Sequence, residues 1–339
     1  MKTIVSVQEI SEFEIKPRAA VARWRALVEA EIAQRWADRS GWIHVDWPTC
    51  NQKDEIPAFE RYGIAYVECP ACGSLYAPFR PKENELWAWY RESAPARFWR
   101  EQLLPASEAA RREKMTRPRA EWVLDGIAEY VPSARRLVDI SPHGRGLVDL
   151  VAAENPGLVE IVAAGMTSDF EGISTPRVQV QPTWVADLSG HGPADVIVAI
   201  DALDRTADLG ALVRAFVQLL APGGVVFATA TVASGFEIQA LWERSQTIIP
   251  PDKLNLPTVV GLQQIFAAPN WEILELSTPG MFDVEMVRRA IEVEPDAAWP
   301  RLVRALVERT DAAGRTALVE LLQSRRLTAF ARLVVRKES

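Results

Sequence analysis

Apolar and polar residues alternate in two rhythms over the second half of the chain. Short apolar runs, each long enough for a strand, are separated by stretches with apolar residues at helical spacing. The predicted strands cover 137–140, 159–163, 177–181, 195–200, 225–231 and 271–276. Helices are predicted over 147–154 and 209–220, and the stop signal Ala221-Pro222-Gly223-Gly224 closes the second. This alternation predicts a mostly parallel sheet with helices on both faces.

The end of the chain departs from this alternation. Helical patterns follow one another over 283–293, 298–311 and 315–324, and residues 328–336 then alternate as a strand. We expect this last strand to run antiparallel and to return to the edge of the sheet. The predicted fold class is therefore α/β, a Rossmann-like doubly wound sheet with helical additions and a small N-terminal ribbon-like module.

The first part of the chain has its own pattern. Residues 18–38 predict an amphipathic helix, whereas the Pro-, Gly- and aromatic-rich segment from Gly41 to Pro81 predicts short strands and turns. A helical pattern then returns, in which Pro105 and Pro118 start or break helices. The predicted units are a helical segment at 1–40, a cysteine-containing module at 41–81, a helical linker at 82–134 and a Rossmann domain at 135–339 with a helical insertion at about 280–325.

Composition excludes several classes of protein. The net charge of −7 argues against nonspecific binding of nucleic acid, which needs a basic surface. We expect no membrane span and no signal peptide, because no apolar stretch is long enough and acids come early in the chain. Three cysteines cannot all pair with one another, so we expect a reducing, cytoplasmic setting.

A glycine loop between the first strand and its helix is the first candidate for chemistry. Asp139 ends the strand, and Gly144 and Gly146 follow within RRLVDISPHGRGL. Glycine is needed where a backbone approaches a ligand closely, and the helix start offers free N–H groups. The loop is therefore either the binding site of a nucleoside cofactor or a tight strand-to-helix turn with a capping acid.

The order of the motifs along the chain favours the binding site of a nucleoside cofactor. The run ADVIVAID at 194–201 is followed by a helix and then by LLAPGGVVFATA. This order resembles the class I S-adenosylmethionine-dependent methyltransferases. PACGSLYAPFRPKENELWAWY, RREKMTRPRAEWVL, GFEIQALWERSQTIIPPDKLNL and LELSTPGMFDVEMVRRA are similar to a bacterial subgroup with a cysteine-rich N-terminal module, often encoded among sugar or surface-polysaccharide genes. The resemblance spans roughly residues 45–336.

The resemblance implies a set of cofactor contacts. They are Asp139, Ser141, Gly144 and Gly146 in the loop, Asp187 at the adenine and Asp201 near the methionine portion. Asp187 also fits a loop residue that caps a helix. The chain departs from the family where Ser141 and His143 stand at common glycine positions. It departs again at the end of the second strand, where the ribose acid is missing and Asp169 is the nearest substitute.

The candidate catalytic residues also depart from the family. The usual Glu-x-x-Glu-His after the fourth strand reads Asp201-Ala202-Leu203-Asp204-Arg205 here. Lys253 stands where relatives carry a histidine that could serve as a base. Asp204 and Lys253 are the candidates for handling the proton of the acceptor, although lysine is a poor base unless burial lowers its pKa. The resemblance also places Trp242 at an acceptor pocket, where a core role is the alternative.

The cysteines suggest a modified metal site. Relatives carry Cys-x-x-Cys twice, which is a four-thiolate zinc site, but Trp47 occupies the first of these positions. The remaining candidate ligands are Cys50, Cys69 and Cys72, with His44 or Asp46 as the fourth. The alternative is a ribbon that has lost its metal and packs Trp47 in the gap.

These observations predict methyl transfer from S-adenosylmethionine to a small acceptor, for which the resemblance implies a sugar or polysaccharide precursor. Catalysis would rest mainly on placing the acceptor in line with the methyl group. The several departures leave open a catalytically inactive scaffold, or the partner subunit of an active homologue. A homo-oligomer or a hetero-oligomer fits either function.

Overall fold

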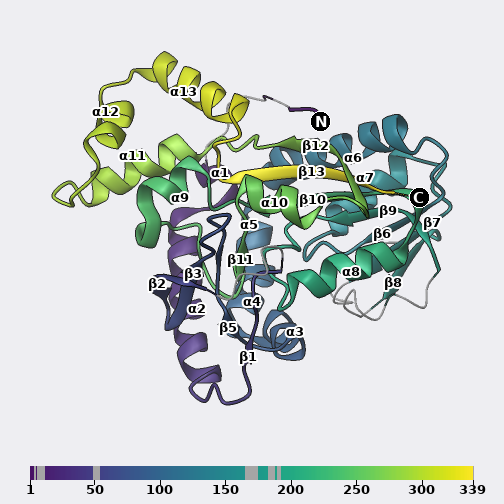
Figure 1. Ribbon diagram of the computed structural model, residues 1–339, viewed down its shortest axis with the longest axis horizontal. Helices are drawn as coiled ribbons and strands as arrows, with labels where there is room; N and C mark the ends of the chain where they lie inside the picture. The colour runs from purple at the N-terminus through teal and green to yellow at the C-terminus, as the bar shows by residue number, and fades with distance from the viewer. Residues whose placement is uncertain are drawn as a thin grey trace.

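A seven-stranded sheet forms the centre of the protein (Figure 1). The computed structural model describes residues 1–3, 5, 12–48, 54–164, 175–181, 188 and 192–338. The strands are β6 (Arg136–Asp139), β7 (Glu160–Ala164), β8 (Val178–Gln181), β9 (Ala194–Ala199), β10 (Leu220–Thr231), β12 (Trp271–Ser277) and β13 (Phe330–Lys337). Their order is β12-β13-β10-β9-β6-β7-β8, with parallel pairing from β10 to β8. The predicted α/β fold with a mostly parallel sheet is confirmed.

The last strand is antiparallel to both neighbours, as predicted, but its expected place at the edge of the sheet is wrong. β13 lies between β10 and β12, and β12 is the edge strand. Leu333 and Val335 belong to the core on one face and Val334 to the core on the other. A strand buried on both faces gains most from two neighbours, because its backbone groups then pair on both sides.

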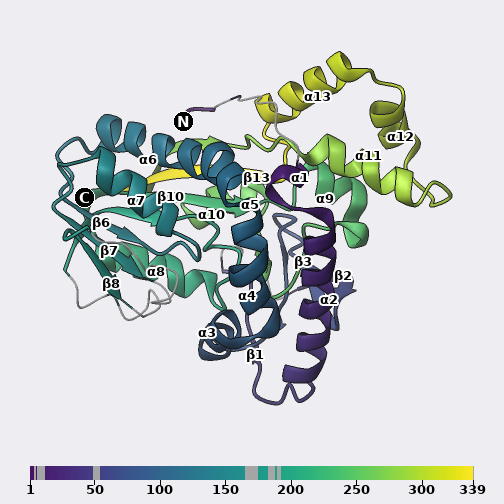
Figure 2. The ribbon, with the colours of Figure 1, turned by 180° about the vertical axis from the view of Figure 1, so that it is seen from behind.

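Helices cover the two faces of the sheet. The sequence DVIVA in β9 shows why, since Val196 and Val198 join one core and Ile197 and Ala199 join the other. On one face lie α8 (Leu209–Leu219) and α10 (Val259–Ile265), which are in front in Figure 1. On the other lie α6 (Arg117–Tyr130) and α7 (Arg145–Glu154), which Figure 2 shows from behind. The Asp208 side chain accepts a hydrogen bond from the Ala211 amide and so begins α8.

The segment before the sheet combines helices and short strands. Its elements are α1 (Glu12–Ile15), α2 (Arg18–Arg35), β1 (Ile43–His44), β2 (Ile56–Arg61), β3 (Ile64–Glu68), β4 (Leu75–Tyr76) and β5 (Phe79–Arg80). β1 pairs with β5, and a second sheet has the order β11-β4-β3-β2. Its end strand β11 (Asn255–Leu256) comes from far along the chain, after β10. Backbone hydrogen bonds between β4 and β11 therefore join the cysteine-containing segment to a segment that follows β10.

A long helical path connects this segment to the sheet. It consists of α3 (Glu83–Glu92), α4 (Ala94–Phe98), the π-helical turn η1 (Trp99–Leu103), α5 (Leu104–Arg111) and the π-helical turn η2 (Arg112–Thr116), and it continues into α6. Pro105 and Pro118 lie in the first turns of α5 and α6, as expected for residues without an N–H donor. Both π-helical turns contribute residues to the cavities described below.

The remaining helices lie beyond one end of the sheet. They are α9 (Phe236–Leu241), the 3-10 turn η5 (Trp242–Arg244), α11 (Asp283–Val293), α12 (Arg301–Glu308) and α13 (Ala312–Ser324), of which the last three are yellow-green in Figures 1 and 2. The three predicted C-terminal helices are thus present. Val284, Val287 and Ile291 anchor α11 in a small core of its own. In the described residues, no helix combines the length and apolar character that crossing a membrane requires.

Candidate functional site

Two adjoining cavities lie at the carboxyl ends of the parallel strands. A smaller one of about 370 Å³ and a larger cleft of about 740 Å³ both have Pro142 and His143 in their walls. Ile140 and Ala164, at or just beyond the ends of β6 and β7, also line the cleft. This is the edge at which open α/β sheets bind their ligands.

Asp139 is turned into the loop rather than toward a cavity. It is fully buried, and its Oδ1 accepts hydrogen bonds from the Ser141 amide at 3.2 Å and the Ser141 hydroxyl at 2.5 Å. The Ser141 Oγ in turn accepts from the Ile200 amide at 3.0 Å, so the loop is fixed to the end of β9. Burial raises the pKa of Asp139 to about 7, against the effect of the Ser141 hydrogen bonds.

The glycines of the loop have different roles. A Cβ on Gly144 would lie 1.8 Å from Asp139 Oδ2, so only glycine fits over the carboxylate. Gly144 and Ser141 line the smaller cavity. A Cβ on Gly146 would lie 3.2 Å from Thr116 Cγ2, which makes this glycine a packing residue between α7 and η2.

Asp201 is held in an unusual conformation next to the smaller cavity. Its φ of +56° lies in the left-handed region that non-glycine residues rarely adopt. The Asp201 amide donates to Thr229 Oγ1 at 2.8 Å, and this hydroxyl donates to Asp201 Oδ1 at 3.0 Å. Arg119 Nη1 lies 3.3 Å from Asp201 Oδ2. Burial opposes the charge, but Arg119 and other nearby cations hold the pKa of Asp201 below its usual range.

The smaller cavity therefore presents opposite charges side by side. Arg119 and Asp201 line it together with Thr116, Ser141 and Gly144. An α-amino acid group carries one carboxylate and one ammonium, so it matches this pair when the carboxylate faces Arg119 and the ammonium faces Asp201. Sequence reasoning missed Arg119, although it lies in RREKMTRPRAEWVL, one of the stretches that carried the resemblance.

Asp204 and Lys253 are brought together, but outside both cavity walls. Asp204 is fully buried and accepts hydrogen bonds from the Thr231 amide and hydroxyl as well as from Lys253 Nζ. Burial raises the pKa of Asp204, although Lys253 opposes the shift. Neither residue is among those that line the cavities. Their contacts are those of a buried ion pair, and a catalytic role for them stays a prediction.

Five aromatic side chains from the helices before the sheet line the larger cleft. They are Trp24 of α2, Trp87, Trp89 and Tyr90 of α3, and Trp99 of η1. The ring of Trp99 stacks on His143 with 5.9 Å between centroids. The cis peptide Pro250-Pro251 and the neighbouring Asp252 close another side.

Arg205 is the residue of this cleft that the sequence pattern misrepresented. In the sequence, Arg205 stands where the family carries a histidine. In the structure it lines the cleft, with its Nη2 3.5 Å from Asp252 Oδ2. Its burial lowers the pKa, but Asp252, Tyr90 and two aspartates outweigh this and raise it above the ordinary value. Trp242 lies elsewhere and packs edge-on against Phe59 at 5.7 Å.

Several predicted contacts lie outside the described residues. They are Asp187, Asp169 and the ligand candidate Cys50. Ala164 ends β7 without an acid, in agreement with the sequence.

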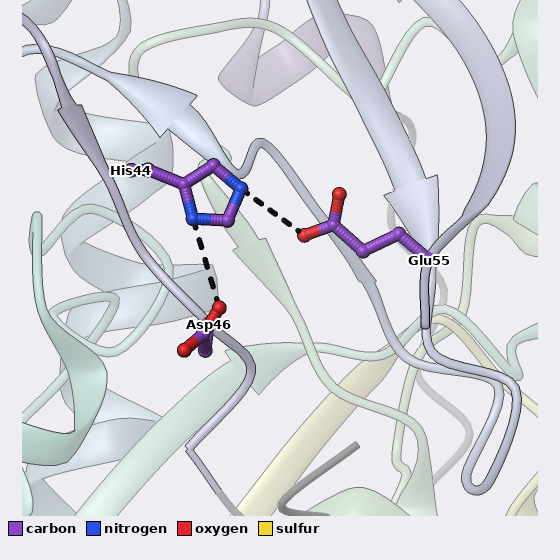
Figure 3. A group of neighbouring side chains, drawn as sticks. All are labelled: His44, Asp46 and Glu55. Atoms are coloured by element: carbon purple, nitrogen blue, oxygen red, sulfur yellow. Dashed lines mark ion pairs between the residues drawn. The ribbon is translucent and has the colours of Figure 1, made fainter. Parts of the chain in front are cut away.

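The predicted zinc ligands do not gather among the described residues. Cys69 and Cys72 are buried, and Cys72 Sγ donates to Ser74 Oγ at 3.1 Å. Trp47 packs against Tyr76 at 5.3 Å. His44 lies instead between two acids, with Nδ1 3.6 Å from Asp46 Oδ1 and Nε2 3.5 Å from Glu55 Oε1 (Figure 3). A zinc site that includes Cys50 stays a prediction, which metal analysis of the purified protein tests.

The strand order, the glycine loop and the cavity at the carboxyl ends define a Rossmann-like domain of the methyltransferase type. Residues 111–276 match the family described as methyltransferase domain. Residues 111–276 are thus similar to a methyltransferase domain, in agreement with the class I S-adenosylmethionine-dependent methyltransferase fold that the sequence predicts. No curated protein matches the chain.

Solved structures resemble the chain only distantly. The plantazolicin methyltransferase BpumL in complex with SAH is 9% identical, with 76% of this chain and 95% of that chain covered and a TM-score of 0.47. A putative sarcosine dimethylglycine methyltransferase from Galdieria sulphuraria is 15% identical, with 70% and 88% covered and a TM-score of 0.42. The [4+2]-cyclase SpnF is 18% identical, with 64% and 81% covered and a TM-score of 0.40.

Proposed function

We propose that this protein transfers a methyl group from S-adenosylmethionine to a small acceptor. The observation that carries the proposal is the Arg119–Asp201 pair in the wall of the smaller cavity, next to Ser141 and Gly144. These residues fit the amino acid portion of the cofactor, and the amides that begin α7 lie beside it. Gly144 also lines this cavity, and a side chain at this position would collide with Asp139.

The cofactor, when bound, supplies an electrophilic methyl group. The chain would hold the amino acid portion with Arg119 and Asp201. Pro142 and His143 belong to the wall that this cavity shares with the aromatic cleft. The cleft would bind the acceptor, exclude water from it and orient it toward the shared wall. This division of labour is catalysis by proximity and needs no strong base.

A sugar or polysaccharide precursor is the acceptor class that we favour. Sugar rings stack their C–H faces on aromatic side chains, and Trp24, Trp87 and Trp99 supply such faces in the cleft. The similarity of the sequence to the sugar-associated subgroup supports the same class. A methylation assay with sugar acceptors and detection of S-adenosylhomocysteine tests it.

Binding of the cofactor is tested by calorimetry with S-adenosylmethionine and with methylthioadenosine, which lacks the amino acid portion. Arg119→Gln is expected to weaken binding of S-adenosylmethionine at least about tenfold, because a charged hydrogen bond is lost, and to leave methylthioadenosine unaffected. Arg117→Gln is the matched control, since Arg117 lies on the same helix and pairs with Glu113 and Glu154 instead. No binding of the cofactor at millimolar concentration to the unchanged protein would refute the proposal.

A catalytically inactive scaffold is the second candidate. The ion pair between Asp204 and Lys253 favours it. These two residues are the candidates for handling the proton of the acceptor, and they bind each other outside the residues that line the cavities. It predicts cofactor binding without turnover of any acceptor. Sizing of the purified protein alone and with an active homologue would test the oligomer that this reading implies.

A further inference from the structure

The guanidinium of Arg205 is buried without a hydrogen bond to any described residue. The residue is 9% exposed. Its described contacts are the Asp252 carboxylate, 3.5 Å from Nη2, and the Tyr90 ring, whose centroid is 5.5 Å from Cζ. Its Nε is shielded from solvent and has no partner in the described part of the chain. Leaving a donor of a buried cation unused is costly, so this arrangement favours an acceptor beyond the described residues.

Trp99, another residue of the cleft wall, repeats this observation. Its Nε1 is also buried without a partner among the described residues. The described cleft residues that have buried, unpartnered side-chain atoms are Arg205 and Trp99, and both atoms are donors. Two residues of the cleft wall thus have donors without a described partner, which favours a ligand that offers hydrogen-bond acceptors.

The charges of the cleft point in the same direction. Arg100 and Arg205 are the cations in its described wall, and Asp252 is the acid. Arg100 donates to the backbone oxygens of Tyr90 at 2.8 Å and Arg91 at 3.0 Å, which fixes its position but leaves its charge at the wall. The balance is positive, although the protein as a whole carries a net charge of −7.

We propose that the cleft binds an acceptor with a carboxylate or phosphate attached to a ring, and that Arg205 receives the anionic group. The aromatic side chains would hold the ring, and the guanidinium, a planar donor, would pair with two oxygens of the anion. The Asp252 carboxylate, 3.5 Å from Nη2, is the group with which the anion competes for Arg205. This inference rests on the proposed function, which assigns the cleft to the acceptor. Binding in the cleft can nevertheless be measured without turnover.

Saturation-transfer NMR with matched probes tests the inference. The first set shares a pyranose ring and comprises D-glucose, D-glucuronate and α-D-glucose 1-phosphate. The second pair shares a flat ring and comprises 4-hydroxybenzyl alcohol and 4-hydroxybenzoate. In the ring type that binds, an acidic probe is expected to bind at least about tenfold more tightly than its neutral partner. The carboxylate and phosphate members show which anion the cleft prefers.

Two variants assign the preference to Arg205. Arg205→Gln is expected to remove the advantage of the acidic probe, and Asp252→Asn to increase it, because the guanidinium then has no competing carboxylate. Arg214→Gln, at an exposed arginine of α8 outside the cleft, is expected to change nothing. Acidic probes that bind no better than neutral ones, or an advantage that survives Arg205→Gln, would overturn the inference.

The same samples separate this inference from the proposed function. Calorimetry with S-adenosylmethionine reports on the smaller cavity, and the probes report on the cleft. Cofactor binding without an anion preference sinks only the inference about Arg205. An anion preference without cofactor binding sinks only the methyltransferase proposal.

Discussion

Gly144→Ala tests the packing of the glycine loop on Asp139. The new Cβ would lie 1.8 Å from Asp139 Oδ2 and 2.9 Å from its Cγ. The carboxylate cannot simply swing away, because the Ser141 amide and hydroxyl hold its other oxygen. Losing these hydrogen bonds costs about 1 kcal/mol each, and overpacking adds about 1–3 kcal/mol. The free energy of unfolding should therefore fall by about 3–5 kcal/mol.

Urea unfolding followed by tryptophan fluorescence measures this change. Gly41→Ala is the control, since the nearest atom to its new Cβ would be Glu85 Oε1 at 3.5 Å, and its effect should be within about 0.5 kcal/mol. The double variant Asp139→Ala/Gly144→Ala should lose about 1 kcal/mol or more less unfolding free energy than the two single variants lose together, because the new Cβ no longer meets a carboxylate. A fully stable Gly144→Ala, or strictly additive effects, would refute the reasoning.

Two further predictions concern buried charges. Burial raises the pKa of Asp139 from 3.8 to about 7, so its contribution to stability is present below the lower value and is lost as the pH rises through the higher one. Asp139→Asn should therefore flatten the fall in unfolding free energy between about pH 4 and 7, and an unchanged slope would contradict this. Arg80→Leu should lower the free energy of unfolding by about 3–5 kcal/mol, because the fully buried guanidinium donates to Asn255 Oδ1 and to the backbone oxygens of Ala207 and Leu254. Arg91→Leu, at an exposed arginine, should cost less than about 0.5 kcal/mol, and equal effects of the two substitutions in the same urea titrations would contradict this prediction.

The strands and helices of the sheet could be predicted from the sequence because their apolar residues repeat with a clear period. The run at 195–200, for example, is found as β9 at Ala194–Ala199. The place of β13 could not be predicted in the same way. Periodicity tells which residues are buried but does not tell which strand lies beside which, and the long connection through α11, α12 and α13 allows either position.

The site was predictable only in part, and the reason is physical. The loop residues Ser141 and Gly144 could be found because they are close in sequence and share a local constraint. Arg119 could not, since its partner Asp201 is brought near by the packing of α6 against the sheet. Arg205 was visible as a departure from a pattern, but its meaning depends on Asp252 and on the aromatic residues of distant helices.

The pairing of β4 with β11 has a consequence for the order in which the protein can fold. A ribosome makes the chain from its N-terminus, so Leu75 and Tyr76 emerge long before their partners Leu256 and Asn255. Until this segment appears, β4 lacks one neighbour and Arg80 lacks the oxygens of Leu254 and Asn255 to which it donates. The early segment must therefore wait, incompletely structured, for a late one. In a nascent chain halted before residue 255, β4 should therefore be open to cleavage by protease. In a chain that has been completed and released from the ribosome, β4 should be protected.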